Sequence, residues 1–154
     1  MQLTRLLKLQ IHLGDSLAIG EVPMGTRGIG VVAGGSFEGE RLRGTVMTPG
    51  ADWVLFDAQG MGRIDVRMVL QTDDGVNIYV QYLGVLELNA AMQSALAEGT
   101  ETRFGDNYLM TQPRFETGDT RYAWLNDVVA VAEGRAIAGG VEYQIYACEA
   151  GTSS

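Results

Sequence analysis

Residues 64–83 read IDVRMVLQTDDGVNIYVQYL, and this stretch decides the fold. On both sides of Asp73-Asp74-Gly75, apolar and polar side chains alternate. Successive side chains of a β-strand point to opposite faces, so this period is typical of strands with one buried face. Asp-Gly between two such runs is a strong hairpin signal. The stretch predicts two antiparallel strands, at 64–72 and 76–83, joined by a tight turn.

The rest of the chain repeats this pattern on both sides of the hairpin. Gly14-Asp15 is expected to end the first strand, and Pro49-Gly50 is expected to form a turn. Residues 89–98 are rich in good helix formers and precede Gly99, which predicts the only helix. Short apolar or alternating runs predict further strands at 3–13, 29–33, 41–48, 53–56, 108–116, 121–131 and 141–146.

This succession of about nine or ten short strands, with one short helix, indicates an all-β protein. We expect a closed antiparallel β-barrel, because closure removes exposed strand edges. No linker, internal repeat or low-complexity tract interrupts the pattern. The sequence therefore predicts a single barrel domain over residues 1–150, followed by a frayed tail at 151–154.

Composition limits the possible functions. The chain has 154 residues and a formal net charge of −8, with no basic stripe, which argues against a nucleic-acid partner. A single cysteine, Cys148, excludes an intramolecular disulfide framework and a multi-cysteine zinc site within one chain. The apolar run at the N-terminus is too short for a signal peptide, and none is long enough for a membrane helix. We expect a cytoplasmic protein without a membrane partner.

Motifs for metals, phosphates and nucleophilic catalysis are weak. His12 is the only histidine, which disfavours a metal site or a Ser-His-Asp triad. Residues 25–30 are glycine-rich but lack the spacing of a phosphate loop and the helix that should follow it. Residues 73–75 lack the rest of a calcium-binding loop. The sequence predicts no metal and no cofactor.

Several predicted strands carry polar and aromatic side chains on one face. In one interpretation this face is solvated and its residues form cross-strand polar pairs. In the other it lines the barrel interior around a small ligand, since eight-stranded barrels can hold one and pockets combine apolar walls with a few polar groups. Both interpretations stay open. The residues concerned are Asp52, Asp65, Arg67, Asn77, Tyr79, Gln81, Tyr108, Met110, Gln112, Arg114, Glu116, Tyr122, Trp124 and Asn126.

Three blocks of sequence resemble one known family. They comprise residues 34–39, 42–44 and 50–53 in the first block, 72–75 and 78–80 in the second, and 113–117 and 122–126 in the third. Together they resemble, over nearly the whole chain, the bacterial and fungal family called domain of unknown function three-two-three-seven. The resemblance implies a barrel similar in shape to allene oxide cyclase and lipocalin barrels, and a homo-oligomer of two or more copies.

The resemblance also maps individual positions. The segment Gln81-Tyr82-Leu83 departs from the family's pattern, which is more basic or amide-rich there. The matching residues are Asp52, Trp53, Asp65, Arg67, Tyr79, Phe115, Glu116, Trp124 and Asn126.

These observations lead to three functional hypotheses. The first is a cofactor-independent isomerase, cyclase or lyase for a small aromatic or unsaturated molecule, with Asp52 moving a proton while Arg67 and Tyr79 polarise an oxygen. The second is a non-catalytic carrier or sensor of a hydrophobic small molecule. The third is a structural domain with a filled interior. The expected substrate contacts are Asp65, Tyr108, Arg114, Glu116, Trp124 and Asn126. In a carrier that uses the same pocket, Arg67 and Asp65 would instead form a structural ion pair.

Overall fold

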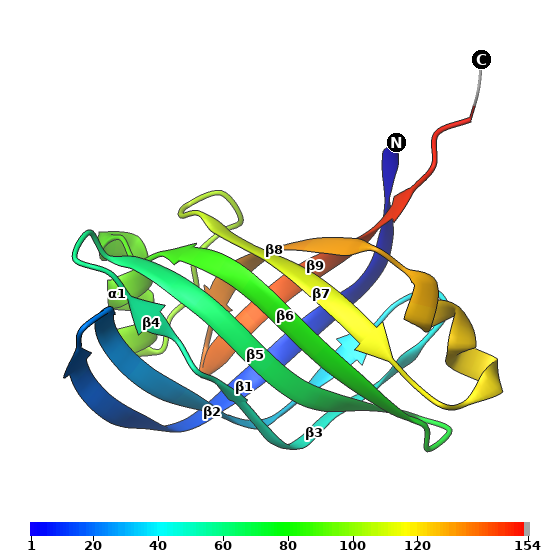
Figure 1. Ribbon diagram of the computed structural model, residues 1–154, viewed down its shortest axis with the longest axis horizontal. Coiled ribbons are helices and arrows are strands. Elements are labelled where there is room, and N and C mark those ends of the chain that lie inside the picture. The colour runs from blue at the N-terminus through cyan, green and yellow to red at the C-terminus, as the bar shows by residue number, and fades with distance from the viewer. Residues whose placement is uncertain (153–154) are drawn as a thin grey trace.

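The computed structural model describes residues 1–152, which form nine β-strands, one α-helix and one 3-10 helix, η1 (Figure 1). In chain order the elements are β1 (Gln2–Val22), β2 (Gly25–Glu38), β3 (Arg43–Asp52), β4 (Leu55–Phe56), β5 (Met61–Thr72), β6 (Asn77–Glu87), α1 (Ala90–Glu98), β7 (Leu109–Glu116), η1 (Thr120–Asp127), β8 (Ala130–Ile137) and β9 (Gly140–Glu149).

Eight strands form a closed ring. Their order is β1-β9-β8-β7-β6-β5-β3-β2, and β2 pairs again with β1. All pairings are antiparallel, from the β1–β2 pair to the β8–β9 pair. The short β4 pairs with both β2 and β5 beyond the end of β3. The predicted all-β fold, a closed antiparallel barrel with one short α-helix, is therefore confirmed.

The hairpin and the helix form for local reasons that the sequence showed. The last β5–β6 pair before the turn is Gln71 with Asn77, and Gly75 has a φ of 87°, a left-handed conformation that favours glycine. At the start of α1, the Asn89 side chain accepts a hydrogen bond from the Met92 backbone N–H at 3.0 Å. Gly99 ends the helix with a φ of 68°.

The predicted strand at 121–131 is wrong over most of its length. Residues 120–127 form η1, and β8 begins only at Ala130. The Asp119 carboxylate accepts a hydrogen bond from the Arg121 backbone N–H at 2.8 Å, and a further bond joins the Asp119 carboxylate to the Arg121 side chain at 3.0 Å. These local bonds give the backbone an alternative to pairing in a sheet, so residue alternation here does not reflect a strand.

Two predicted strand ends are also wrong. β1 continues through Gly14-Asp15 to Val22, and its pairing with β2 shifts register between Leu13 and Ser16. β3 continues through Pro49-Gly50 to Asp52, because its pairing with β5 resumes after an irregularity. Bulges absorb extra residues without reversing the chain, which is why both signals occur inside strands. The strand predicted at 53–56 is limited to Leu55–Phe56.

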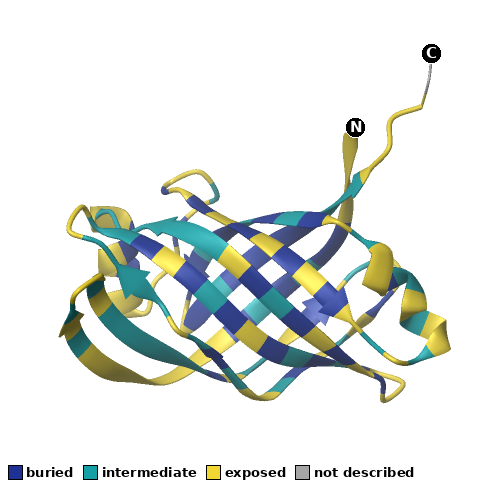
Figure 2. Cartoon of the chain, viewed as in Figure 1, coloured by how far each residue is buried: buried dark blue, intermediate teal, exposed yellow. Residues whose placement is uncertain are grey.

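Along β5, β6, β7 and β8, buried residues alternate with more exposed ones (Figure 2). The inner face of β5 carries Ile64, Val66, Met68 and Leu70, all at most 4% exposed. These residues pack in one continuous core with the inner faces of the other strands. The buried parity of each alternating strand, which is mostly apolar, therefore faces the barrel interior, and the intervening residues face outward.

The ends of the barrel differ in what closes them. Figure 1 shows α1 and β4 at one end, beside the tip of the β1–β2 hairpin, and the turn between β5 and β6 at the other. The tail predicted at 151–154 includes residues 153 and 154, which lie outside the described residues. Within residues 1–152, no helix has the length and apolar character needed to cross a membrane.

Candidate functional site

The barrel is hollow at the end where α1 lies. A cavity of about 420 Å³ opens there, between the inner faces of the strands and the side of α1. Most of its lining is apolar, with contributions from β2, β5, β7, β4 and the helix. Representative lining residues are Val32, Val66, Leu109, Phe56 and Met92. Cavities of this size and character commonly hold small organic ligands.

The cavity exists because β2 has glycines where other strands have side chains. Gly28 and Gly30 share the parity of the buried Val32, and Gly30 pairs with Asp52 across β2 and β3. A Cβ atom at Gly30 would have one neighbour within 4 Å, the Asp52 Cβ at 3.9 Å, so the space in front of it is free. Two successive inward positions of β2 therefore leave room for a ligand.

Asp52 is the carboxyl group inside this cavity. It pairs with the buried Val66 of β5, which places both on the inner face. Its Oδ1 accepts a hydrogen bond from the Asp65 backbone N–H at 3.0 Å. Burial raises the pKa of Asp52 from 3.8 to about 6, against the opposing effect of that hydrogen bond, and the nearby Asp65 carboxylate adds a smaller increase. Near neutral pH, both protonation states are therefore accessible to Asp52.

Two buried tyrosines, from β6 and β9, add polar groups to the cavity. Tyr82 on β6 and Tyr143 on β9 are 3% and 4% exposed. Their rings meet edge to face, with centroids 5.5 Å apart and an interplanar angle of 66°. Burial raises the pKa of both phenols, and the negative charge of Asp52 adds to the increase. Interaction between the two hydroxyls further raises the pKa of Tyr82 and lowers that of Tyr143. Both hydroxyls therefore stay protonated, and the pair can present a hydrogen-bond donor to a ligand.

The other predicted site residues do not line this cavity. Asp65 and Arg67 on β5 and Tyr79 on β6 lie on the outer face, because each alternates with buried aliphatic neighbours. On β7, the buried residues are Leu109, Thr111, Pro113 and Phe115, so the remaining positions face outward. Those outward positions are Met110, Gln112, Arg114 and Glu116, and the exposed Tyr108 directly precedes the strand.

Trp124 and Asn126 lie at the opposite end of the barrel, on η1. The Arg41 guanidinium lies over the Trp124 ring, 3.5 Å from its centroid. The Asn126 side chain bonds the backbone of Thr117, accepting from its N–H at 2.8 Å and donating to its carbonyl at 3.0 Å. The expected convergence of the predicted set on one enclosed space is therefore wrong, and of that set Asp52 alone faces the cavity. Burying Arg67 or Arg114 without a partner would carry a large desolvation cost.

Sequence reasoning missed Tyr82 and Tyr143, although a signal for both was present. Tyr82 shares the parity of Ile78 and Val80, and Tyr143 shares that of Ile145. A tyrosine within an otherwise aliphatic parity is a polar group on the buried face. Following the apolar parity rather than the polar one would have identified them.

Among residues 1–152, no group of three or more His, Cys, Asp or Glu side chains is arranged to hold a metal ion.

Comparisons with known proteins place this barrel in one family. The sequence pattern of the family described as Protein of unknown function (DUF3237) matches residues 1–148. UPF0311 protein RPA1785 of Rhodopseudomonas palustris is 32% identical over 114 residues, which is 74% of each chain. Its crystal structure aligns over 95% of this chain and 96% of its own, with a TM-score of 0.86.

Two further solved structures share the fold. A β-barrel-like protein from Acinetobacter baumannii is 34% identical, with a TM-score of 0.82 and 96% of each chain covered. An enzyme from Penicillium herquei is 21% identical, with a TM-score of 0.70 over 96% of this chain and 94% of its own, a likeness that shows the fold alone. The match over residues 1–148 shows that this chain belongs to the DUF3237 family of proteins of unknown function.

Proposed function

We propose that this protein binds a small, largely apolar organic molecule at the α1 end of the barrel, and that Asp52 exchanges a proton with it. The observation that carries this proposal is a carboxyl group with its pKa raised to about 6 inside an apolar cavity of about 420 Å³. General acid–base catalysis works best with a pKa near the working pH. A perturbed carboxyl in a cavity is therefore a candidate catalytic group.

The arrangement suits isomerase, cyclase or lyase chemistry on an aromatic or unsaturated molecule with one oxygen function. As a carboxylate, Asp52 removes a proton from the substrate, and the electron pair left behind moves towards the substrate oxygen. The hydroxyl of Tyr82 or Tyr143 donates a hydrogen bond to that oxygen as its negative charge grows. In an isomerisation or cyclisation, the Asp52 carboxyl then returns the proton to another substrate atom. In an elimination, a bond to a leaving group breaks as the double bond forms, and the Asp52 carboxyl gives the proton to that leaving group. Protons and electrons therefore balance without an external oxidant or reductant.

The tyrosines take the role that the sequence had suggested for Arg67 and Tyr79. A phenol donates a hydrogen bond without introducing a charge, so it stabilises an oxyanion in an apolar cavity at a lower desolvation cost than an arginine. This argument favours an uncharged substrate. A ligand with its own carboxylate would be repelled by ionised Asp52, and Arg27, a cation in the cavity lining, is hydrogen-bonded to the Trp53 carbonyl at 2.6 Å.

The apolar walls favour a second candidate, a carrier or sensor that binds its ligand without changing it. In that case Asp52 and the tyrosines only orient the ligand through hydrogen bonds. The third hypothesis, a structural domain with a filled interior, disagrees with the cavity beside α1.

Extraction of the freshly purified protein, followed by mass spectrometry, tests binding. We expect a small organic molecule to co-purify, or the neutral fluorophore N-phenyl-1-naphthylamine to bind when none does. Failure of both would contradict the proposed cavity function. If a molecule is found, incubation with fresh protein should convert it, and wild-type protein that binds it without conversion would favour the carrier.

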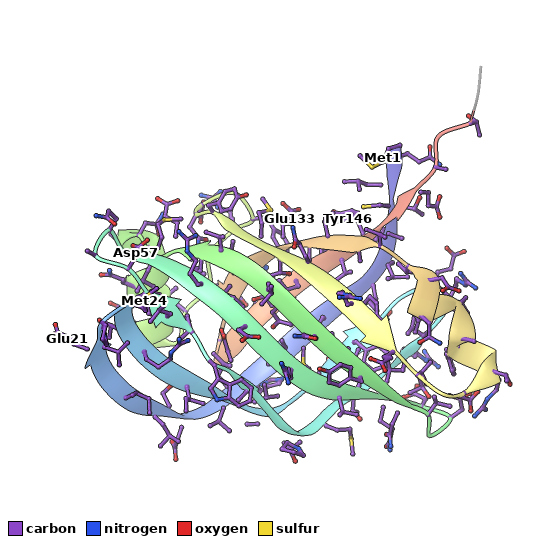
Figure 3. All side chains as sticks on the ribbon, in the orientation of Figure 1. Met1, Glu21, Met24, Asp57, Glu133 and Tyr146 are labelled. Carbon is purple, nitrogen blue, oxygen red and sulfur yellow. The ribbon has the colours of Figure 1, made fainter. Side chains whose placement is uncertain are left out.

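The variant Asp52→Asn separates the two roles of the residue. The amide has nearly the same shape but cannot carry the proton, so we expect the ligand to be retained and conversion to fall by about 100-fold or more. Glu21→Gln is the matched control, since Glu21 is exposed at the same end of the barrel (Figure 3). Conversion that survives Asp52→Asn would remove Asp52 from the mechanism.

A further inference from the structure

The outer face of the barrel carries a second hollow, a groove across β6, β7 and β8. We call it the β6–β8 groove; its volume is about 690 Å³. Leu83 is 55% exposed, Met110 is 40% exposed and Leu3 is 56% exposed. Figure 3 marks Tyr146 and Glu133 on this side of the molecule. Its apolar lining consists of Leu3, Leu83, Val85, Met110, Val131 and Tyr146.

The neighbouring strand β5 does not share this apolar character. On the neighbouring β5, three successive outward positions are Arg63, Asp65 and Arg67, as expected of a sheet face in water. The outward positions Leu83 and Val85 of β6 pair directly with Asp65 and Arg63, so the change from polar to apolar occurs between adjacent strands. A contiguous exposed apolar patch with a polar border is typical of an interaction surface.

Charges of opposite sign lie in the groove and directly beside it, at different levels along the strands. Glu133 pairs with Met110, and Arg114 lies four residues further along β7, about 13 Å away at the usual rise of a strand. Among residues 1–152, neither Arg114 nor Glu133 has an oppositely charged side chain within 4 Å. Gln112 lies midway between Met110 and Arg114.

We infer that the β6–β8 groove binds a second copy of this chain, face to face, about a two-fold axis that crosses β7 at Gln112. This axis lies in the plane of the interface and is perpendicular to β7, so β7 of the second copy runs in the opposite direction. Met110 of one copy and Arg114 of the other are then at the same height along the strand. Arg114 of one copy then faces Met110 and Glu133 of the other, and the same contact occurs twice by symmetry. Arg114 and Glu133 of one copy thus pair with Glu133 and Arg114 of the other copy.

The composition of this surface agrees with such an interface. Its centre is apolar, its border holds Glu133 and the exposed Tyr108, and Arg114 lies beside it, at the next outward position of β7 after Gln112. Interfaces are enriched in tyrosine, methionine and arginine, with charges at the rim. Because the groove lies on the outer face, the contact leaves the opening of the cavity beside α1 free, and the inference does not depend on the proposed function.

Sedimentation velocity of the full chain over a range of concentrations tests the interface. We expect a species of about twice the 16.6 kDa monomer mass. Met110→Glu places a carboxylate at the apolar centre and should weaken association by at least about 100-fold. Ile19→Glu is the control, because Ile19 is 58% exposed on β1 away from this groove. A wild-type monomer, or a dimer lost in the control and kept in Met110→Glu, would overturn the inference.

A charge exchange tests the pairing itself. Arg114→Glu and Glu133→Arg each create two like-charge contacts, so each alone should weaken the dimer by about 10-fold. The double variant restores opposite charges and should recover most of the wild-type affinity. Both residues are on the barrel surface, and circular dichroism should show unchanged folding. Additive weakening in the double variant would refute the Arg114–Glu133 contact.

Discussion

The two ends of the barrel are built from the same strands, yet one is filled and the other is hollow. At the η1 end, buried side chains such as Leu70, Ile78 and Leu125 are fully enclosed, each at 0% exposure. Trp124 packs against this core, with Arg41 over its ring. At the α1 end, the glycines of β2 leave the interior open and a carboxyl faces the space.

The difference shows how one fold separates stability from binding. A filled end contributes hydrophobic burial without polar groups that need partners. The hollow end gives up packing and carries Asp52, whose ionised form is disfavoured by burial. Because the strands run through both ends, the packing at η1 holds the walls of the cavity in place.

Removing packing at the filled end should produce the largest effect. We expect Leu70→Ala to lower the free energy of unfolding by about 2–5 kcal/mol, because it removes buried methyl groups and leaves a cavity. Leu17→Ala, at the border of the hollow end where Leu17 is 58% exposed, should cost less than about 1 kcal/mol. Urea unfolding followed by circular dichroism measures both. If both variants lost the same free energy of unfolding, the two ends would not differ in how tightly they are packed.

The next effect is a pH dependence at the hollow end. The pKa of Asp52 is about 6 in the folded protein and 3.8 in a model peptide, so the folded state binds its proton more tightly. The contribution of Asp52 to the free energy of unfolding is therefore fully present below pH 4, and it is lost as the pH rises towards 6 and above. The full loss is at most about 3 kcal/mol, and solvent screening of this partly buried group reduces it.

Asp52→Asn should remove this dependence. The difference in unfolding free energy between variant and wild type should therefore shift in favour of the variant between pH 4 and pH 7. Urea unfolding at a series of pH values measures it, and the difference between the two proteins cancels the contributions of the other carboxyls. A constant difference across this range would show that burial does not perturb Asp52.

Filling the cavity should produce a smaller effect, on binding. Gly30→Leu places a side chain in the free space before Asp52, and Gly30 does not have a left-handed backbone that would oppose the substitution. We expect affinity for N-phenyl-1-naphthylamine to fall by about 10-fold or more, which corresponds to about 1.4 kcal/mol. Gly118→Leu, in the loop before η1, is the matched control. Unchanged affinity in Gly30→Leu would place the ligand elsewhere.

The smallest effect should come from the closure of the filled end. Arg41→Ala removes the cation over the Trp124 ring and should lower the free energy of unfolding by about 0.5–1 kcal/mol. Arg41→Lys keeps a positive charge but loses the planar stacking on the ring. Its free energy of unfolding should therefore lie between those of the wild type and Arg41→Ala. A fluorescence shift of Trp124 would accompany the change. A loss above about 2 kcal/mol would mean that this contact does more than cover the core.

The sequence predicted most of the fold because its signals are local. Alternation identified β5 and β6, Asp-Gly located their turn, and a run of helix formers before Gly99 located α1. The predicted strand ends were wrong where the same short sequence can form either a turn or a bulge inside a strand. Pro49-Gly50 forms an irregularity inside β3 instead of a turn, since the neighbouring strands hold the chain extended on both sides.

Of the candidate site, the sequence identified Asp52 but not its partners. Strand alternation by itself placed Arg67 and Tyr79 on one face and Tyr82 on the other. Apolar side chains avoid water, so the face that Tyr82 shares with Ile78 and Val80 is the inner one. The hypothesis that the polar and aromatic residues surround a ligand placed the opposite face of these strands inside the barrel.

The sequence by itself determined most of the strands, the α-helix, the alternation of side chains along the hairpin strands and the family. Closure of the ring was decided by tertiary structure, because it joins β1 to strands at both ends of the chain. The same closure brought Asp52, Tyr82 and Tyr143 to one cavity from three strands. Their approach depends on register between distant segments and on space left by glycines of a fourth strand, and neither is encoded in a local pattern.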